Sequence, residues 1–276
     1  MTEIIAVVSD FHIGSTVGLC PPLVNLDDGG TYKASRGQRW LWECWLDYIG
    51  KVKAAAGANP ITAIINGDAV EGDTKDRSNQ IITKNKSNIL SMATDVLAPL
   101  MDISSRAFFI RGTSAHVGKS AELEEELASD CTITERAEST ASWWELYAEF
   151  SGVYFDISHH GRVGGMEWTR ANPLGTLAIA LELDYARQKL PINVAIRSHN
   201  HKHADSYTNY PVRVIFTGAW ELKTEHTHRM AIVGQADIGG EIITVKDGKM
   251  TSEFIPYKPE RRRVWRVSRT ATSGRK

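Results

Sequence analysis

Short apolar runs alternate with longer stretches of helical periodicity through the first two thirds of the chain. The runs are bounded by glycine, proline or polar residues, which predicts buried strands. Between them, apolar residues recur every three or four positions, which predicts amphipathic helices. Strands that alternate with helices form right-handed βαβ units and a largely parallel sheet. We expect strands at residues 4–8, 61–66, 106–111, 153–158 and 192–197, and helices at 38–53, 78–100, 122–127, 141–150 and 174–188.

The last third of the chain has a different pattern, in which strand-like segments follow one another without helices between them. Turns at Gly239-Gly240 and Asp247-Gly248-Lys249 punctuate this part and predict hairpins in a second, more antiparallel sheet. The expected fold is a single layered α/β domain over residues 1–257. The glutamates of the 122–127 helix are expected to form a solvated face. The expected late strands are 212–217, 230–233, 241–245 and 251–255.

The composition indicates a cellular compartment and an uneven distribution of charge along the chain. Three widely spaced cysteines do not form a disulfide framework, which favours a reducing cytoplasm. We expect neither a signal peptide nor a membrane segment, because no apolar run approaches about 20 residues. The formal net charge is −1, but residues 258–276 hold eight basic residues and one acid, a charge of +7 that leaves −8 elsewhere. This basic C-terminal tail suits a nucleic-acid backbone or an acidic partner, and equally a solvated, mobile terminus.

Polar side chains with metal-binding chemistry follow each of the five expected parallel strands. Because parallel strands present their carboxyl ends along one edge, we expect these side chains to converge there. Carboxylates and imidazoles without a thiolate suit Mn, Fe or Zn better than Ca, and the set could fill two positions that share one carboxylate. The simpler alternative is that they are scattered polar loop residues. The side chains are Asp10, His12, Asp68, Thr113, His116, His159 or His160, His199 and His201.

In this order, the motifs resemble those of the calcineurin-like metallophosphoesterases. The resemblance runs from about residue 4 to about residue 255 and leaves the tail outside. It implies an α/β/β/α sandwich with two mixed sheets. The form Gly-Thr-x-x-His is similar to phage-encoded members, which implies a phage or prophage origin and then a host cytoplasm. The matching motifs are Ser9-Asp10-Phe11-His12, Gly67-Asp68-Ala69-Val70-Glu71, His160-Gly161 and Ser198-His199-Asn200-His201.

The resemblance also implies a pair of divalent metal ions and a role for each residue. Manganese is favoured, with Fe, Zn, Ni or Mg as alternatives. Asp68 would bridge the two ions, so its loss should be the most damaging single change. Asp10, His12 and His201 would hold one ion, and His160 and His199 would hold the other.

Two positions depart from the family pattern or leave a choice open. Thr113 stands where the family has an asparagine ligand, so its hydroxyl, Ser114 or a water could complete the second ion's shell. His116, carried on a longer turn, would act as general acid. Gly161 favours His160 over His159 as ligand. Strand alternation is expected to put the two rings on opposite faces, with His159 behind the ligands or buried.

The implied reaction is in-line hydrolysis of a phosphate ester by a metal-bridging hydroxide. The basic tail favours a phosphodiesterase or nuclease that acts on DNA or RNA. The alternatives are a phosphomonoesterase or nucleotide phosphatase, and a non-catalytic binding platform on the same fold. The tryptophans at 40, 42 and 45 are expected to lie in the core or at a subunit contact, which makes a homodimer a candidate.

Overall fold

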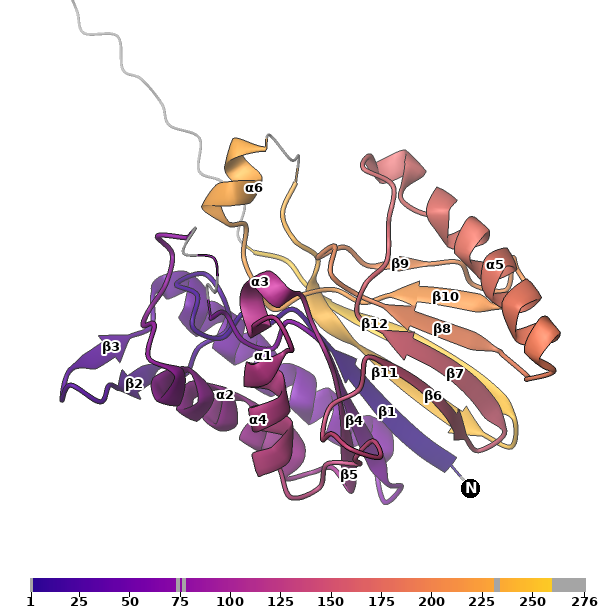
Figure 1. The fold of residues 1–276 in the computed structure, drawn as a ribbon, viewed down its shortest axis with the longest axis horizontal. Helices are drawn as coiled ribbons and strands as arrows, with labels where there is room; N and C mark the ends of the chain where they lie inside the picture. Colours follow the sequence, from indigo (N-terminus) through magenta and orange to yellow (C-terminus); the bar gives the residue numbers. More distant parts are fainter. Residues whose placement is uncertain (1, 73–74, 76–77, 231–233, 260–276) are drawn as a thin grey trace, which may run out of the picture.

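Two five-stranded sheets face each other in the computed structural model, which describes residues 2–72, 75, 78–230 and 234–259 (Figure 1). One hydrophobic cluster lies between the sheets, a second lies between the first sheet and its helices, and a third lies under the helix of the second sheet. This confirms the layered α/β class with two mixed sheets. The expected strand at 230–233 falls largely on residues outside the described part of the chain.

The first sheet has the order β12-β11-β1-β4-β5. Its centre is parallel, since β1 pairs with β4 and β4 with β5, whereas β11 is antiparallel to both β1 and β12. The hairpin of β11 and β12 therefore extends the first sheet, contrary to the expectation that it belongs to the second. The strands are β1 (Thr2–Val8), β4 (Ile61–Asn66), β5 (Arg106–Ile110), β11 (Ile238–Lys246) and β12 (Lys249–Tyr257).

The second sheet has the order β6-β7-β8-β10-β9. Here β7, β8 and β10 are parallel, and the outer strands β6 and β9 run antiparallel to their neighbours. A small hairpin of β2 (Leu23–Asn25) and β3 (Thr31–Lys33) lies apart from both sheets. The strands of the second sheet are β6 (Glu145–Phe150), β7 (Val153–Ser158), β8 (Val194–Arg197), β9 (Ala204–Asp205) and β10 (Arg213–Phe216).

Helices cover both outer faces of the pair of sheets (Figure 1). On the first sheet lie α1 (Arg36–Ala56), α2 (Lys86–Met101) and α4 (Glu122–Asp130), and α5 (Asn172–Gln188) covers the second. Short helical turns form α3 (Ser114–Val117), α6 (Glu225–Arg229) and the 3₁₀ segment η1 (Glu167–Thr169). Each of the described helices is too short or too polar to cross a membrane.

Two sequence predictions of helix were wrong in part. The expected helix at 141–150 contains the strand β6, whose buried Leu146 and Phe150 alternate with exposed neighbours. Its pattern has a period of two, which the two tryptophans before it obscured. The expected helix at 78–100 begins only at Lys86, because Asn85 caps it by accepting hydrogen bonds from the amides of Ser87 and Asn88.

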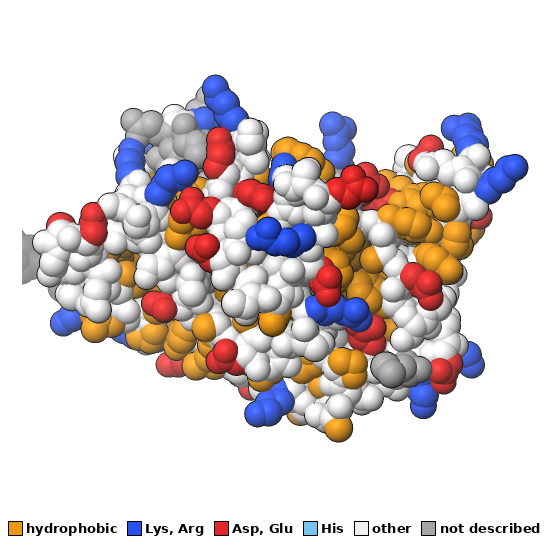
Figure 2. All heavy atoms as spheres, turned by 60° about the horizontal axis from the view of Figure 1, so that its bottom comes forward, with side chains coloured by type: hydrophobic (Ala, Val, Ile, Leu, Met, Phe, Trp, Pro, Cys, Tyr) orange, Lys and Arg blue, Asp and Glu red, His pale blue; other side chains and the backbone are white. Residues whose placement is uncertain are grey.

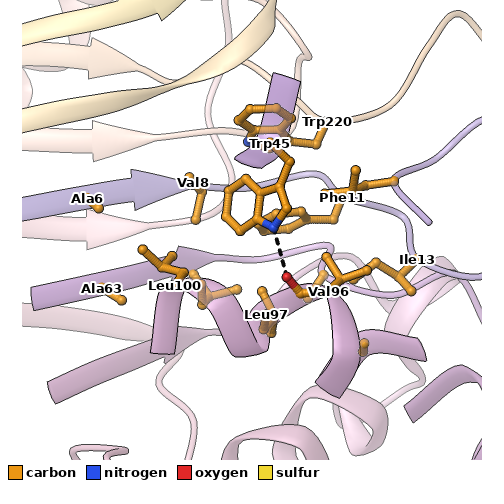
Figure 3. Close-up of a cluster of buried hydrophobic side chains, with 14 of the residues drawn as sticks. Ala6, Val8, Phe11, Ile13, Trp45, Ala63, Val96, Leu97, Leu100 and Trp220 are labelled. Carbon is orange, nitrogen blue, oxygen red and sulfur yellow. Dashed lines mark hydrogen bonds between the residues drawn. The ribbon is translucent and has the colours of Figure 1, made fainter. Parts of the chain in front are cut away.

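Trp45 of α1 forms the centre of the largest core cluster (Figure 3). Its ring meets Phe11 edge-on at 5.3 Å and Trp220 at 5.0 Å, and its Nε1 donates to Val96 O at 2.8 Å. Phe11 belongs to the loop after β1, so this packing fixes the position of the residues on either side of it. Because Trp45 is fully buried, it is not available to a subunit contact.

Charged side chains of both signs are interspersed on the face shown in Figure 2. Hydrophobic side chains gather toward the end that carries α5 in Figure 1, where Ile179 and Leu183 of α5 are exposed. This surface differs from the tryptophan-rich helix that the sequence suggested as a dimer contact, and a homodimer stays a prediction.

Replacement of Trp45 by alanine should lower the free energy of unfolding by about 3–5 kcal/mol, because it opens a cavity and removes the hydrogen bond from Trp45 Nε1 to Val96 O. Urea denaturation followed by circular dichroism measures the change. Trp168→Ala is the matched control, since Trp168 is 80% exposed and its loss should change stability by less than about 0.5 kcal/mol. Equal effects of the two substitutions would contradict this account of the core.

Candidate metal centre and active site

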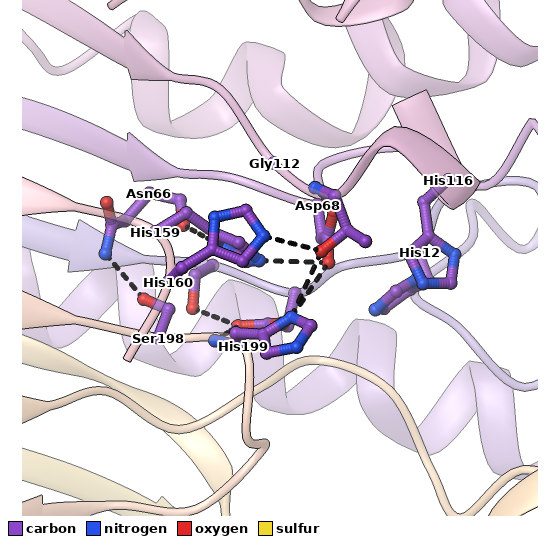
Figure 4. Close-up of polar contacts among 12 residues, drawn as sticks. His12, Asn66, Asp68, Gly112, His116, His159, His160, Ser198 and His199 are labelled. Carbon is purple, nitrogen blue, oxygen red and sulfur yellow. Dashed lines mark hydrogen bonds and ion pairs between the residues drawn. The ribbon is translucent and has the colours of Figure 1, made fainter. Parts of the chain in front are cut away.

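The polar residues that follow the parallel strands meet where the two sheets adjoin (Figure 4). Asp10 and His12 follow β1, Asp68 follows β4, and Thr113 follows β5 just before α3, which carries His116. From the second sheet, His159 and His160 follow β7, and His199 and His201 follow β8. The structure therefore brings every candidate residue named from the sequence into one region. They come from two sheets, however, and not from one edge of a single parallel sheet as expected.

The backbone of this region is strained in a way that points to function. A positive φ is uncommon for a residue with a side chain, yet it occurs at five of the candidates. Hydrogen bonds between loops hold this geometry: Asp10 N donates to Gly67 O at 3.0 Å and His12 N to Asp68 O at 3.1 Å. The five residues and their φ values are Asp10 (52°), His12 (46°), Asp68 (50°), His199 (74°) and His201 (52°).

Two glycines allow the loops to approach one another this closely. A β-carbon at Gly67 would clash with the ring of His159, and one at Gly112 would clash with the backbone and carboxylate of Asp68. Gly67 also has a φ of 82°, which favours glycine. The glycine of the Gly-Asp motif is thus required by the packing of a histidine from the other sheet.

Asp10, His12 and His201 form the first cluster of potential ligands. His201 Nε2 lies 3.3 Å from Asp10 Oδ1 and 3.2 Å from His12 Nε2. Although Asp10 Oδ1 is buried, it accepts no hydrogen bond from the described residues. Burial by itself would raise the pKa of Asp10, but the neighbouring His201 outweighs it and lowers the pKa to about 2. This carboxylate is therefore charged and has an oxygen open to a cation.

His159, His160 and His199 form the second cluster, and Thr113 lies beside it. Thr113 Oγ1 is 3.3 Å from His160 Nε2 and 3.1 Å from His199 Nδ1, so its hydroxyl lies beside two imidazoles of this cluster. His159 Nε2 lies 3.0 Å from Asp68 Oδ2, and its Nδ1 lies 2.7 Å from the carbonyl oxygen of Asn66.

The rings of His159 and His160 do not lie on opposite faces, contrary to the expectation from strand alternation. Their centroids are 4.9 Å apart, and both rings reach the cluster with His199. The reason is that β7 ends at Ser158, so neither residue follows the alternation of a strand. His159 is buried as expected, but its Nε2 is aimed at the centre, and the geometry keeps both histidines as candidates.

Asp68 lies between the two clusters (Figure 4). Its carboxylate belongs to one group with Asp10 and His159 and to another with His12 and His116. Burial would raise the pKa of Asp68, but the charges and hydrogen bonds of His159 and His199 hold it well below its usual value. A charged carboxylate within reach of members of both clusters is what a bridging ligand requires.

Glu71 sets the orientation of two histidines at once. Its Oε2 is 3.3 Å from His12 Nδ1 and 2.5 Å from His116 Nδ1. Burial would raise the pKa of Glu71, but these contacts lower it to about 2, so the carboxylate is an acceptor and both Nδ1 atoms donate. Both Nε2 atoms then face inward, which is the arrangement seen when a carboxylate orients a metal-binding histidine.

Glu221 is a second carboxylate at the first cluster, and sequence reasoning did not identify it. It is 3% exposed, and its Oε2 lies 3.7 Å from His12 Nε2 and 3.9 Å from His201 Nδ1. The neighbouring amide of Trp220 donates to Asp10 O at 3.0 Å, which fixes the segment against the loop after β1. No local motif marks Glu221, because it reaches the site through a contact that is distant in sequence.

Glu124 contradicts the expectation of a solvated acidic face on α4. It is 1% exposed, and its two oxygens accept hydrogen bonds from the amides of Ala69 at 3.0 Å and Gly112 at 2.5 Å. Burial, together with the nearby charge of Asp68, raises its pKa to about 7. Glu124 therefore ties the loops after β4 and β5 together beneath Asp68.

These residues fit a pair of divalent cations. Four charged or buried carboxylates surround the imidazoles, one buried oxygen lacks a donor, and two imidazole nitrogens face each other at 3.2 Å. The four potential metal-binding groups among the described residues contain only histidine and aspartate. Such a mixed oxygen and nitrogen set suits Mn, Fe or Zn.

Comparisons with known proteins give remote similarities. No family model matches the sequence, and no curated protein matches it. Among solved structures, the chain is similar to a dimetal phosphatase from Danio rerio (11% identity, 91% of this chain and 95% of that chain covered, TM-score 0.45). It is also similar to a predicted phosphoesterase from Streptococcus pneumoniae (11%, 93% and 90%, TM-score 0.39) and to Zn²⁺-complexed Vps29 from Entamoeba histolytica (11%, 92% and 98%, TM-score 0.40). A phage origin stays a prediction.

Divalent cations should displace protons from this centre. In the metal-free protein, burial would lower the pKa of both His12 and His159, but Glu221 holds that of His12 well above its usual value, and Asp68 raises that of His159 to about 9. Both rings are then protonated at pH 7, and a cation must compete with those protons. We expect Mn²⁺ binding at pH 7 to release about one proton or more per chain, with an affinity that rises as the pH approaches 9.

Isothermal titration calorimetry in PIPES and in HEPES, which differ in ionisation enthalpy, measures this release. A binding heat that is identical in the two buffers would contradict the prediction.

Proposed function

We propose that the chain is a dimetal phosphoesterase of the calcineurin-like type that hydrolyses phosphodiesters. The observation that carries the proposal is the position of Asp68, a buried carboxylate within reach of members of both clusters, Asp10 and His12 of the first and His159 of the second. A single cation site would need only one of these clusters. An ion pair with a purely structural role would not need the imidazole nitrogens of either cluster to face the centre.

Each ion would be held by residues from both sheets. Asp10, His12 and His201 would hold the first, with Glu221 beside them. His199, Thr113 and either His160 or His159 would hold the second, and Asp68 would serve both. Two divalent cations bound there would supply Lewis-acid chemistry, because they lower the pKa of water and offset the negative charge of the phosphate. Manganese is the favoured metal.

His116 would assist the departing group. It lies in α3, its ring meets that of His12 edge-on at 4.5 Å, and its Nδ1 donates to Glu71. The Nε2 atom would then give a proton or a hydrogen bond to the leaving oxygen, while Glu71 holds the ring in orientation. This is the role of general acid that the sequence suggested for His116.

The preference for diesters, and for DNA or RNA among them, is supported by the basic C-terminal tail. Residues 260–276 of that tail lie outside the described part of the chain, so their contribution rests on charge alone. A phosphomonoesterase or nucleotide phosphatase would use the same centre without the tail. A binding platform on this fold is the third alternative, but it would have no use for the position of His116.

We expect the full chain, loaded with Mn²⁺, to hydrolyse bis-p-nitrophenyl phosphate faster than p-nitrophenyl phosphate. Asp68→Asn should lower the rate on the order of a thousand-fold, since one substitution weakens both metal positions. Initial rates from the release of p-nitrophenolate measure both effects. Asp95→Asn is the matched control, because Asp95 is exposed on α2 and should leave the rate unchanged.

The outcomes separate the alternatives. Hydrolysis of the monoester alone would replace the diester proposal with a phosphomonoesterase. Bound manganese without hydrolysis of either ester would favour the platform.

A further inference from the structure

A groove beside the metal centre has the size and chemistry of a nucleoside site. It has a volume of about 720 Å³, and His160 lines one end of it. Small-molecule sites occupy roughly 300–1,000 Å³ and combine an apolar lining with a few polar groups. Because His160 belongs to both the groove and the second cluster, a group covalently attached to a phosphate at the centre is within reach of the groove.

The walls of the groove are apolar and are fixed by the core. Val163, Pro173, Leu177 and Ala180 contribute to the lining, and Val163 and Leu177 pack against the hydrophobic cluster beneath α5. Side chains held in this way offer a preformed surface to a flat ring, such as a nucleobase.

Polar groups lie at the edge of the same groove. Asn172 and Thr176 of α5 are exposed there and could bond the edge of a base or a sugar hydroxyl. Arg162 is also exposed, and its guanidinium pairs with no acid among the described residues, so it is available to a negatively charged substrate. Arg197, by contrast, is buried and bound to Asp156 at 2.7 Å, which removes it from such a role.

The groove is connected to the loop that carries the candidate ligands. Asn200 lies between His199 and His201, and its Nδ2 donates to the carbonyl oxygen of Gly161 at 2.9 Å. A β-carbon at Gly161 would meet Phe216 and Arg197, so the segment from His160 to Arg162 lies tightly against the second sheet. The groove and the centre are therefore held in a fixed relation to each other.

We propose that this groove binds a nucleoside unit attached to the scissile phosphate, so that the substrate is a nucleotide ester. The inference rests on the proposed phosphoesterase function and names the substrate class for the same site. The apolar wall would hold the base, and Arg162 would contact an anionic group of the substrate.

The test uses substitutions that fill the groove and leave the residues of the metal centre unchanged. Ala180→Trp and Thr176→Trp each place a large ring in the groove from an exposed position on α5, and Ala186→Trp is the matched control, exposed on the same helix but away from the groove. The probes are thymidine 5′-(p-nitrophenyl phosphate) and methyl p-nitrophenyl phosphate, with the full chain loaded with Mn²⁺.

We expect either groove substitution to raise the KM for the thymidine ester by about tenfold, a typical value for the loss of an apolar contact surface, and to change the values for the methyl ester by less than about twofold. Ala186→Trp should change neither. An unchanged KM for the thymidine ester, or equal losses on both esters, would overturn the groove assignment and leave the phosphoesterase in place.

If the unmodified protein hydrolyses neither ester, the proposed function fails, and a binding measurement then tests the groove assignment. Calorimetric titration of the Mn²⁺-loaded protein with thymidine 5′-monophosphate then supports the groove if Ala180→Trp weakens binding, and overturns it if the affinities are equal.

Discussion

Buried negative charge is the constraint on which the structure of this site depends. Asp10, Asp68, Glu71 and Glu221 are all buried and lie within one region at the junction of the two sheets. A charge taken out of water is costly unless it is paired, so such a cluster persists only with positive charge among its members. Protonated imidazoles supply that charge in the metal-free protein, and divalent cations would supply more of it. The same charge that makes the site costly would favour the binding of cations there.

The hydrophobic core supports this constraint. Phe11 packs against Trp45 in the core, while the residues on either side of it, Asp10 and His12, belong to the first cluster. Their left-handed backbone is unfavourable in isolation and is maintained because neighbouring loops hold it through hydrogen bonds. Glu124 completes the arrangement from beneath, since it binds the amides of two loops that converge on Asp68. Core packing, strained loops and buried acids therefore form one connected structure.

The sequence predicted best those features that depend on residues close together in the chain. Apolar runs that end in polar residues marked β1, β4, β5, β7 and β8 and the candidate ligands after them, because both signals lie within a few residues of each other. The expectation that these strands share one edge was wrong, because β7 and β8 belong to the second sheet and strand pairing is not visible locally. The sequence was less informative where pairing is distant: nothing near β11 shows that it joins β1, and nothing near Glu221 shows that it reaches His12. Glu124 was misjudged because a glutamate within an acidic run looks solvated, and only the backbone amides that it binds explain its burial. The two histidines after β7 were misjudged because a rule for strands was applied beyond the end of one.

The central claim is that two cations lie on either side of Asp68. A crystal of the full chain soaked in Mn²⁺, with diffraction data collected at the manganese absorption edge, tests it directly. The account predicts two anomalous peaks per chain, one near Asp10, His12 and His201 and the other near His199, with Asp68 between them. A single peak, or peaks away from Asp68, would contradict it.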